Sequence, residues 1–176
     1  MFRHDLTAKL VLICFAGIIL NVTGSLVAQN VDLPIYLDTI GTVFIAALGG
    51  YVPGIAVGFF TNLIGSGFNV DEMYFGLVNI IVAIMSAFFY KQGYYEKFSK
   101  VLMIIPATAL VAALFGSLIE ELLKPINAFS SFSVVFNHFL ANFSSEVPDK
   151  GLAILIAFLL LKLISPELKK TFQLMG

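Results

Sequence analysis

Charged residues are scarce in this sequence, and cysteine is almost absent. Only 12% of the 176 residues are charged and 59% are hydrophobic, whereas soluble domains are about a quarter charged and about half apolar. The single cysteine, Cys14, excludes an intrachain disulfide and is too little for a metal cluster. A soluble fold of this length has too little interior for so many apolar side chains, so the lipid bilayer is the expected environment.

Several binding motifs are missing as well. The net charge is −1 and no basic run is present, which argues against nucleic acid as a partner. Neither a glycine-rich phosphate-binding loop nor a serine elbow occurs, so ATP hydrolysis would belong to another protein. We therefore expect no enzyme activity, no cofactor and no bound metal in this chain.

Long apolar segments dominate what is present. A helix needs about 20 apolar residues to cross the hydrocarbon of a bilayer. Six candidate segments occur: Leu6 to Ala28, Tyr36 to Gly50, Val52 to Phe68, Met73 to Tyr90, Val101 to Leu123, and Gly151 to Ile164. The sequence therefore predicts an all-α polytopic membrane protein, with six transmembrane helices in a single domain over residues 1–176.

Glycine and proline indicate how two of these segments are joined. The second and third segments are separated only by the turn Gly49-Gly50-Tyr51-Val52-Pro53, which predicts a helical hairpin. Gly50, Gly54 and Gly58 follow at intervals of four, on one face of the third segment. Small residues at that spacing let helix backbones approach closely, so this face is expected to pack tightly.

The segment before the sixth span is different in character. Residues 127–147, NAFSSFSVVFNHFLANFSSEV, are rich in serine and aromatic residues and are too polar for an ordinary span. We expect a loop there that carries a short interfacial helix and acts as a lid over a binding site.

Charge orients the predicted spans. Basic residues gather at the N-terminus, in the loop after the fourth span and at the C-terminus: Arg3, Lys9, Lys91, Lys97, Lys100, Lys162, Lys169 and Lys170. The positive-inside rule then places both termini in the cytoplasm of a multi-pass cell-membrane protein. Acidic residues map to the opposite ends of the spans: Asp32, Asp38, Asp71, Glu72, Glu120, Glu121, Glu146 and Asp149. Those acids are either solvated loop charges or the rim of a site that opens to the outside.

Polar groups within such helices are costly, and many of them are functional. Asp38 and Asp149 are interpreted either as caps of the second and sixth helices or as groups that face a solute. The polar residues selected as candidate ligand contacts are Tyr36, Asp38, Asn62, Asn79, Glu120, Glu121, His138 and Asn142. Their carboxylates would pair with a cationic or donor-rich ligand, and aromatic rings would stack on a flat one.

Two short patterns resemble parts of a protease. His138 and Asn142 in NHFLAN, and the Glu120-Glu121 pair, are similar to elements of intramembrane glutamate proteases. That family also needs an arginine after the glutamate pair and a second histidine. Lys124 is the wrong residue at the wrong spacing, so catalysis of this kind is not expected.

A second resemblance is more extensive. LPIYLDTIGTVFIAALGGYVPGIAVGFFTNLIGSG resembles the second and third spans of the substrate-binding S components of energy-coupling-factor vitamin transporters. The shared features are Asp38 at the head of the second helix, the glycine-proline turn, Gly58 and Asn62. The resemblance implies a membrane receptor that binds a micronutrient from outside and topples in the bilayer. Its partners would be a transmembrane coupling protein and two ATPases.

A second class of function stays open. The chain ends in SPELKKTFQLMG, an amphipathic basic segment of the kind that links a membrane domain to a cytoplasmic one. The alternative is therefore an S-component-like sensor domain, with a signalling output domain following Gly176.

Overall fold

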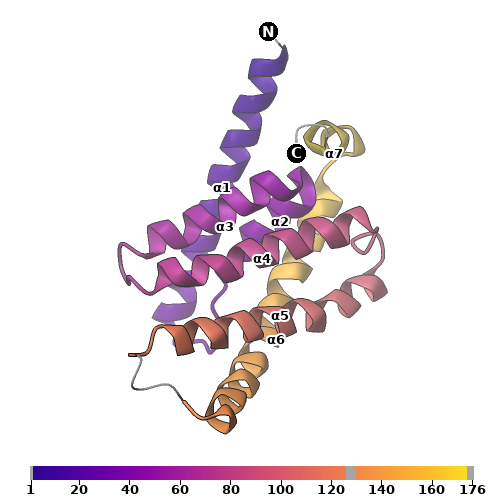
Figure 1. Cartoon of the computed structure of the whole chain (residues 1–176). Coiled ribbons are helices and arrows are strands. Elements are labelled where there is room, and N and C mark those ends of the chain that lie inside the picture. Colours follow the sequence, from indigo (N-terminus) through magenta and orange to yellow (C-terminus); the bar gives the residue numbers. More distant parts are fainter. Residues whose placement is uncertain (1, 126–129, 174–176) are drawn as a thin grey trace.

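The computed structural model describes residues 2–125 and 130–173, and all regular structure in those residues is helical (Figure 1). The helices are α1 (Phe2–Asn30), α2 (Ile40–Gly49), α3 (Tyr51–Gly65), α4 (Glu72–Lys91), α5 (Phe98–Leu122), α6 (Phe132–Leu163) and α7 (Pro166–Gln173). The predicted all-α fold class is confirmed.

Helix α2 is the centre of the bundle. Nine of its ten residues are buried, and it packs against α1, α3, α4, α6 and α7. A helix that is apolar on every side is one that other elements surround. At about 1.5 Å per residue, α2 is only about 15 Å long. Its apolar run therefore fills the protein core, and its N-terminal end reaches the candidate site described below.

The predicted helical hairpin is present. Gly50 alone separates α2 from α3, and its φ of 88° lies in the left-handed region that favours glycine. Four residues on, a Cβ added to Gly54 would lie 2.4 Å from the Cβ of Ala46 in α2. The close approach of the two helices therefore requires glycine at that position, as the spacing of the glycines predicts.

Among the residues that the structure describes, three helices are long and apolar enough to cross a membrane: Ala8–Asn30 within α1, α4 and α5. The bent pair of α6 and α7, at 115°, would be a fourth, whereas α2 and α3 are shorter apolar helices. Large side chains on one face of α1 are exposed, with Leu12 at 67%, Phe15 at 59% and Ile19 at 64%. Such a surface suits lipid rather than water. The structure therefore indicates a helical membrane protein, and the count of six spans stays a prediction.

The predicted loop over residues 127–147 is wrong from residue 132 onward. Helix α6 runs unbroken from Phe132 to Leu163, with Pro148 inside it, so it begins well before the expected start at Gly151. Residues 127–129 lie outside the described residues.

A row of phenylalanine rings lies along one face of the first half of this helix. The ring centroids of Phe132, Phe136, Phe139 and Phe143 follow one another at 6.2–6.3 Å. Their spacing of four, three and four residues places them on one helical face. The serines of this segment are accommodated too, because Ser144 and Ser145 donate hydrogen bonds to the carbonyl of Ala141 one turn earlier. A lid over 132–147 would thus be a helix rather than a loop.

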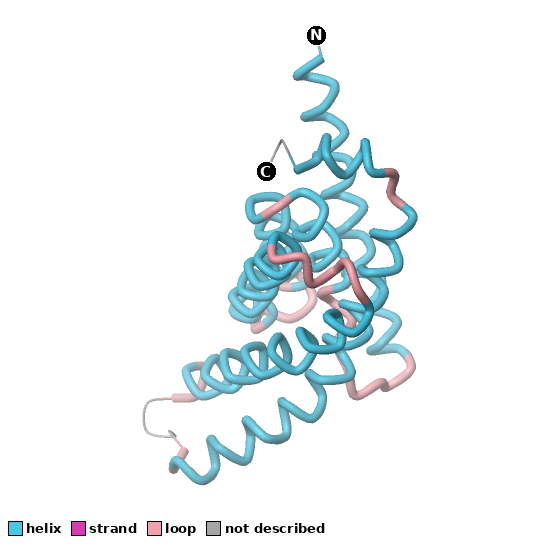
Figure 2. The backbone as a smooth tube through the Cα atoms, turned by 90° about the vertical axis from the view of Figure 1, so that its right-hand side faces the viewer, coloured by secondary structure: helices cyan, strands magenta, loops and turns pink. Residues whose placement is uncertain are grey.

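The tube view in Figure 2 shows how the α5–α6 pair extends away from the rest of the bundle at the end opposite the N-terminus. Helices α5 and α6 pack against each other, and α6 continues past α2 to the bend that leads into α7. The space between the α1–α2 connection, α4 and the α5–α6 pair is where polar side chains converge.

Candidate functional site

A cavity of about 250 Å³ lies where the α1–α2 connection meets α4, α5 and α6. It is lined by Tyr36, Asp38, Thr39, Asn69, Glu72, Phe75, Val78, Asn79, Gly116, Glu120, Asn142, Glu146 and Lys150. Two neighbouring cavities, of about 370 and 550 Å³, share Tyr36, Asp38 and Glu72 with it. The three cavities therefore adjoin one another around these shared residues.

The connection that covers this cavity is fixed to α6 by Asp149. The backbone N–H groups of Tyr36 and Leu37 both donate to Asp149 Oδ1, at 2.9 and 2.6 Å. Leu37 adopts a φ of 54°, which is unfavourable for a side chain with a Cβ, so the paired hydrogen bonds hold a strained backbone. Asp149 is in the interior of α6 and does not cap that helix, which corrects the capping interpretation.

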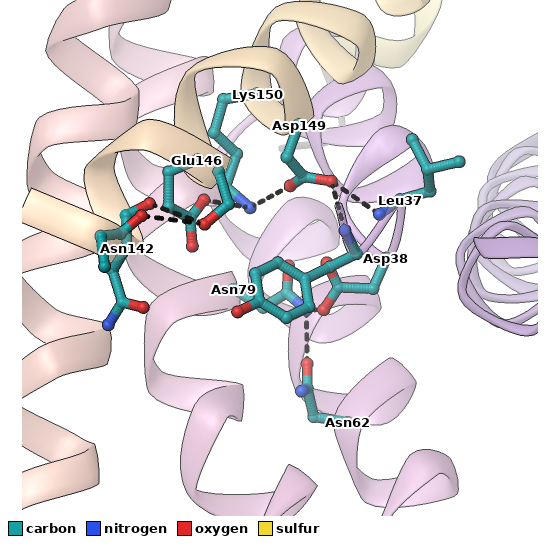
Figure 3. Close-up of polar contacts among 11 residues, drawn as sticks. Leu37, Asp38, Asn62, Asn79, Asn142, Glu146, Asp149 and Lys150 are labelled. Carbon is teal, nitrogen blue, oxygen red and sulfur yellow. Dashed lines mark hydrogen bonds and ion pairs between the residues drawn. The ribbon is translucent and has the colours of Figure 1, made fainter. Parts of the chain in front are cut away.

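Lys150 lies between two acidic groups of its own helix. Its ammonium is 2.6 Å from Asp149 Oδ2 and 2.9 Å from Glu146 Oε2, and its side chain is only 2% exposed (Figure 3). Breaking such a buried ion pair leaves an uncompensated charge, which is strongly destabilising. Lys150 is therefore occupied by these two carboxylates.

Asp38 belongs to a chain of amides that crosses from α4 to α3. Asn79 Nδ2 donates to Asp38 Oδ2 at 3.1 Å and also to Asn62 Oδ1 (Figure 3). Asn62 Nδ2 in turn donates to the carbonyl of Glu72 at 3.0 Å. The residue at the cap position of α2 is Thr39, and it makes no capping hydrogen bond through its side chain. Asp38 therefore faces the cavity, and the interpretation of Asp38 as a helix cap is wrong.

Another amide links α6 to α5 on the far side of the cavity. Asn142 Nδ2 donates to Ser117 Oγ at 2.9 Å and to Glu120 Oε1 at 3.1 Å. The neighbouring Glu121 does not line the cavity, because it pairs with Lys124 at 2.7 Å and accepts a hydrogen bond from the backbone of Ser130. Adjacent helical residues point about 100° apart, which explains why only one of the two glutamates reaches the site.

The structure thus brings together most of the sequence-selected residues and separates two of them. Tyr36, Asp38, Asn79, Glu120 and Asn142 line the cavity, and Asn62 reaches it through Asn79. His138 is exposed on α6. Neither His138 nor Glu121 lines the cavity.

Sequence reasoning missed Thr39 and Lys150 as lining residues, and it named Glu72 and Glu146 only among the acids of a possible rim, not among the selected ligand contacts. Glu146 and Lys150 are four residues apart, and that spacing places them on one face once the segment is known to be helical.

Three polar atoms at this cavity are buried without a hydrogen bond. They are Thr39 Oγ1, Asn79 Oδ1 and Glu146 Oε2, and within residues 2–125 and 130–173 they are the full set of such side-chain atoms. Glu146 Oε2 makes its ion pair with Lys150 but accepts no hydrogen bond. A buried polar atom without a partner costs free energy, so native proteins contain few. The two atoms without any partner, Thr39 Oγ1 and Asn79 Oδ1, belong to residues that line one cavity, which is the pattern expected where a polar ligand supplies the missing partners.

The charge around the cavity is predominantly negative. Asp38, Glu72, Glu120 and Glu146 line it, against the single ammonium of Lys150. In the part of the chain that the structure describes, no basic side chain lies within ion-pair distance of the first three. The cavity is therefore suited to a ligand that brings positive charge.

Asp38 lies in the α1–α2 connection, outside the helices. Desolvation is the main cause that raises its pKa to about 7; the nearby carboxyl groups of Asp149, Glu146 and Glu72 act in the same direction, and Lys150 acts to lower it. The group therefore changes its charge near neutral pH.

The acids are distributed around the cavity and are not gathered at one point. Among the described residues, no three His, Cys, Asp or Glu side chains are grouped closely enough to hold a metal ion. An extended ligand with several donors fits this distribution better than a single ion.

Comparison of the chain with models of protein families, with curated proteins and with solved structures finds no match. The functional argument therefore depends on the residues and geometry described above.

Proposed function

We propose that this chain is a membrane receptor that binds a small, vitamin-like micronutrient from the outside of the cell, for uptake of the energy-coupling-factor type. The observation that carries the proposal is the pair of buried, unpartnered polar atoms, Thr39 Oγ1 and Asn79 Oδ1, at one acidic cavity. A ligand that completes those hydrogen bonds would be bound selectively, since an analogue lacking the donors would leave the protein atoms unpaired.

The cavity suggests the chemistry of the ligand. Asp38, Glu72 and Glu120 favour a cation or a molecule rich in N–H and O–H donors. The rings of Tyr36 and Phe75 also line the cavity, and they supply an apolar surface for a flat ring. A volume of about 250 Å³ lies just below the usual range of small-molecule sites, roughly 300 to 1,000 Å³, so a small ligand is expected.

Uptake would need partners. The chain has no phosphate-binding loop, so the energy for transport would come from two ATPases acting through a transmembrane coupling protein. The exposed apolar faces, such as that of α1, would contact lipid and the coupling protein. Both chain termini would then be cytoplasmic, with the acidic cavity opening outward.

Sidedness is the first test. Because Cys14 is the one cysteine of the chain, Cys14→Ser gives a cysteine-free background for single-cysteine labelling. Asp71 is exposed beside Glu72 at the cavity end, and Gln92 is exposed in the α4–α5 connection at the other end of α4. Each is replaced by cysteine in a separate variant, Asp71→Cys or Gln92→Cys. We expect a membrane-impermeant maleimide to label Asp71→Cys in intact cells and Gln92→Cys only after permeabilisation. The reverse pattern would overturn the proposal, since the cavity would open to the cytosol.

Purification of the protein from its native membrane tests the partners. A coupling protein and two ATPases are expected to remain associated in mild detergent. If the chain were recovered as part of a larger signalling protein that still binds the ligand, the uptake proposal would be ruled out, but the ligand-binding site would be retained.

A further inference from the structure

A second, larger cavity lies at the opposite end of α4. It is a groove of about 700 Å³, lined by Ala46, Ala47, Gly50, Ala87, Tyr90, Lys91, Tyr95, Glu96, Leu161, Lys162 and Lys169. Small residues of α2 and α4 line it together with polar groups from the α4–α5 connection, α6 and α7. None of these residues lines the acidic cavity, so the groove is a separate site.

Positive charge converges on this groove from three helices. Lys91 ends α4, Lys162 is in the last turn of α6 and Lys169 is in α7, whereas Glu96 is the single acidic residue among the lining groups. In the described part of the chain, no carboxylate lies within 4.0 Å of any of the three ammonium groups.

Two of the lysines are positioned by aromatic rings. Lys91 Nζ is 4.3 Å from the centroid of the Tyr51 ring, and Lys162 Nζ is 4.4 Å from that of Phe158. A cation over an aromatic face keeps its full charge. These two ammonium groups are therefore held in place and remain available to an anion.

Helix α7 gives the groove the character of a membrane boundary. It turns by 115° from the axis of α6, and its sequence PELKKTFQ places lysines beside the apolar Leu168 and Phe172. Phe172 is only 2% exposed, so α7 is anchored to the bundle. A short amphipathic helix that lies across the end of an apolar bundle is typical of the headgroup region.

Exposed apolar side chains occur on α6 next to the groove lysine Lys162. Leu163, which follows Lys162, is 81% exposed, and Leu159, one turn before Leu163 on the same face of α6, is 60% exposed. Side chains of this kind contact hydrocarbon in a membrane protein. A molecule with an anionic head and apolar tails matches the succession of lysines and exposed aliphatic groups.

We propose that this groove binds the phosphate group of an anionic phospholipid, with Lys91, Lys162 and Lys169 around the phosphate and the acyl chains along Leu159 and Leu163 of α6. The charge match accounts for the head, because basic pockets at the ends of transmembrane helices bind anionic headgroups. This site does not depend on the proposed receptor function, since no residue of the acidic cavity takes part in it.

The test is a lipid titration of the purified full-length protein in a neutral detergent. Thermal unfolding, followed by circular dichroism, is measured against dioctanoyl phosphatidylglycerol, dioctanoyl phosphatidylcholine and inorganic phosphate. We expect phosphatidylglycerol to raise the melting temperature and the other two to have little effect. Each of Lys91→Gln, Lys162→Gln and Lys169→Gln is expected to weaken phosphatidylglycerol binding about fivefold.

Lys97→Gln is the matched control, because Lys97 is an exposed lysine of the α4–α5 connection that does not line the groove. It should leave the affinity unchanged. If Lys97→Gln lost as much affinity for phosphatidylglycerol as the groove variants, the lipid would be attracted by surface charge in general, and the groove would not be its site. If inorganic phosphate raised the melting temperature as much as phosphatidylglycerol does, the groove would bind free phosphate rather than a lipid headgroup. Unchanged affinity in all three groove variants would overturn the proposal entirely.

Discussion

Replacing Lys150 with methionine tests the buried ion pairs beside the cavity. The side chain is 2% exposed and lies 2.6 Å from Asp149 and 2.9 Å from Glu146. Methionine has a similar length but no charge, so Lys150→Met leaves two buried carboxylates without a counter-charge. Removal of one partner from a buried pair costs about 3–5 kcal/mol, and for a chain of this size the melting temperature should fall on the order of 10 °C.

Circular dichroism of the purified protein in detergent measures this loss, with Lys170→Met in α7 as the matched control because Lys170 is exposed. The control should melt within about 2 °C of the wild type. The double variant Glu146→Gln with Lys150→Met should recover part of the loss, since one of the two unpaired charges is then removed. The reasoning would be refuted if Lys150→Met alone melted as the control does.

Three further predictions concern binding and packing. Asp38→Asn should weaken binding of a cationic ligand at least about tenfold while the protein stays folded. Because the carboxylate form binds a cation and burial raises the pKa of Asp38 to about 7, wild-type affinity should rise with pH through that value and then level off. In Asp38→Asn this dependence should disappear from titration calorimetry. Gly54→Ala should cost about 1–3 kcal/mol, since its Cβ would lie 2.4 Å from that of Ala46. Gly116→Ala, with open space around the added Cβ, should stabilise by about 0.5–1 kcal/mol, and equal melting of the two alanine variants would contradict this packing. Asn21→Ala should lower the free energy of unfolding by about 1–3 kcal/mol in a denaturant titration. The reason is that the buried Asn21 side chain forms hydrogen bonds with two threonine hydroxyls and a backbone N–H. A variant as stable as the wild type would show that these hydrogen bonds do not contribute to stability.

Local apolar runs were the part of the fold most open to prediction. The predicted segment Met73 to Tyr90 corresponds closely to α4, and Val101 to Leu123 to α5, because polar residues bound each apolar run. The first half of helix α6 differs from the prediction, since the serine-rich and aromatic composition of residues 127–147 indicates a loop with only a short interfacial helix. The four-three-four spacing of its phenylalanines was the signal that pointed to a helix.

The site was only partly predictable for a related reason. Asp38 and Asn79 stood out as polar residues within apolar segments, and both line the cavity. The hydrogen bonds from Tyr36 and Leu37 to Asp149 join residues more than a hundred positions apart. Such a contact depends on how the helices pack, which no local pattern in the sequence encodes.

Native mass spectrometry of the protein from gentle detergent, compared with Asp38→Asn, tests the acidic cavity as a ligand site most directly. The account predicts a small organic cation or donor-rich molecule bound to the wild-type protein, and its loss from the variant. A wild-type protein that carries no such molecule after incubation with extract of its native growth medium, or a variant that carries the same molecule in the same amount, would contradict it.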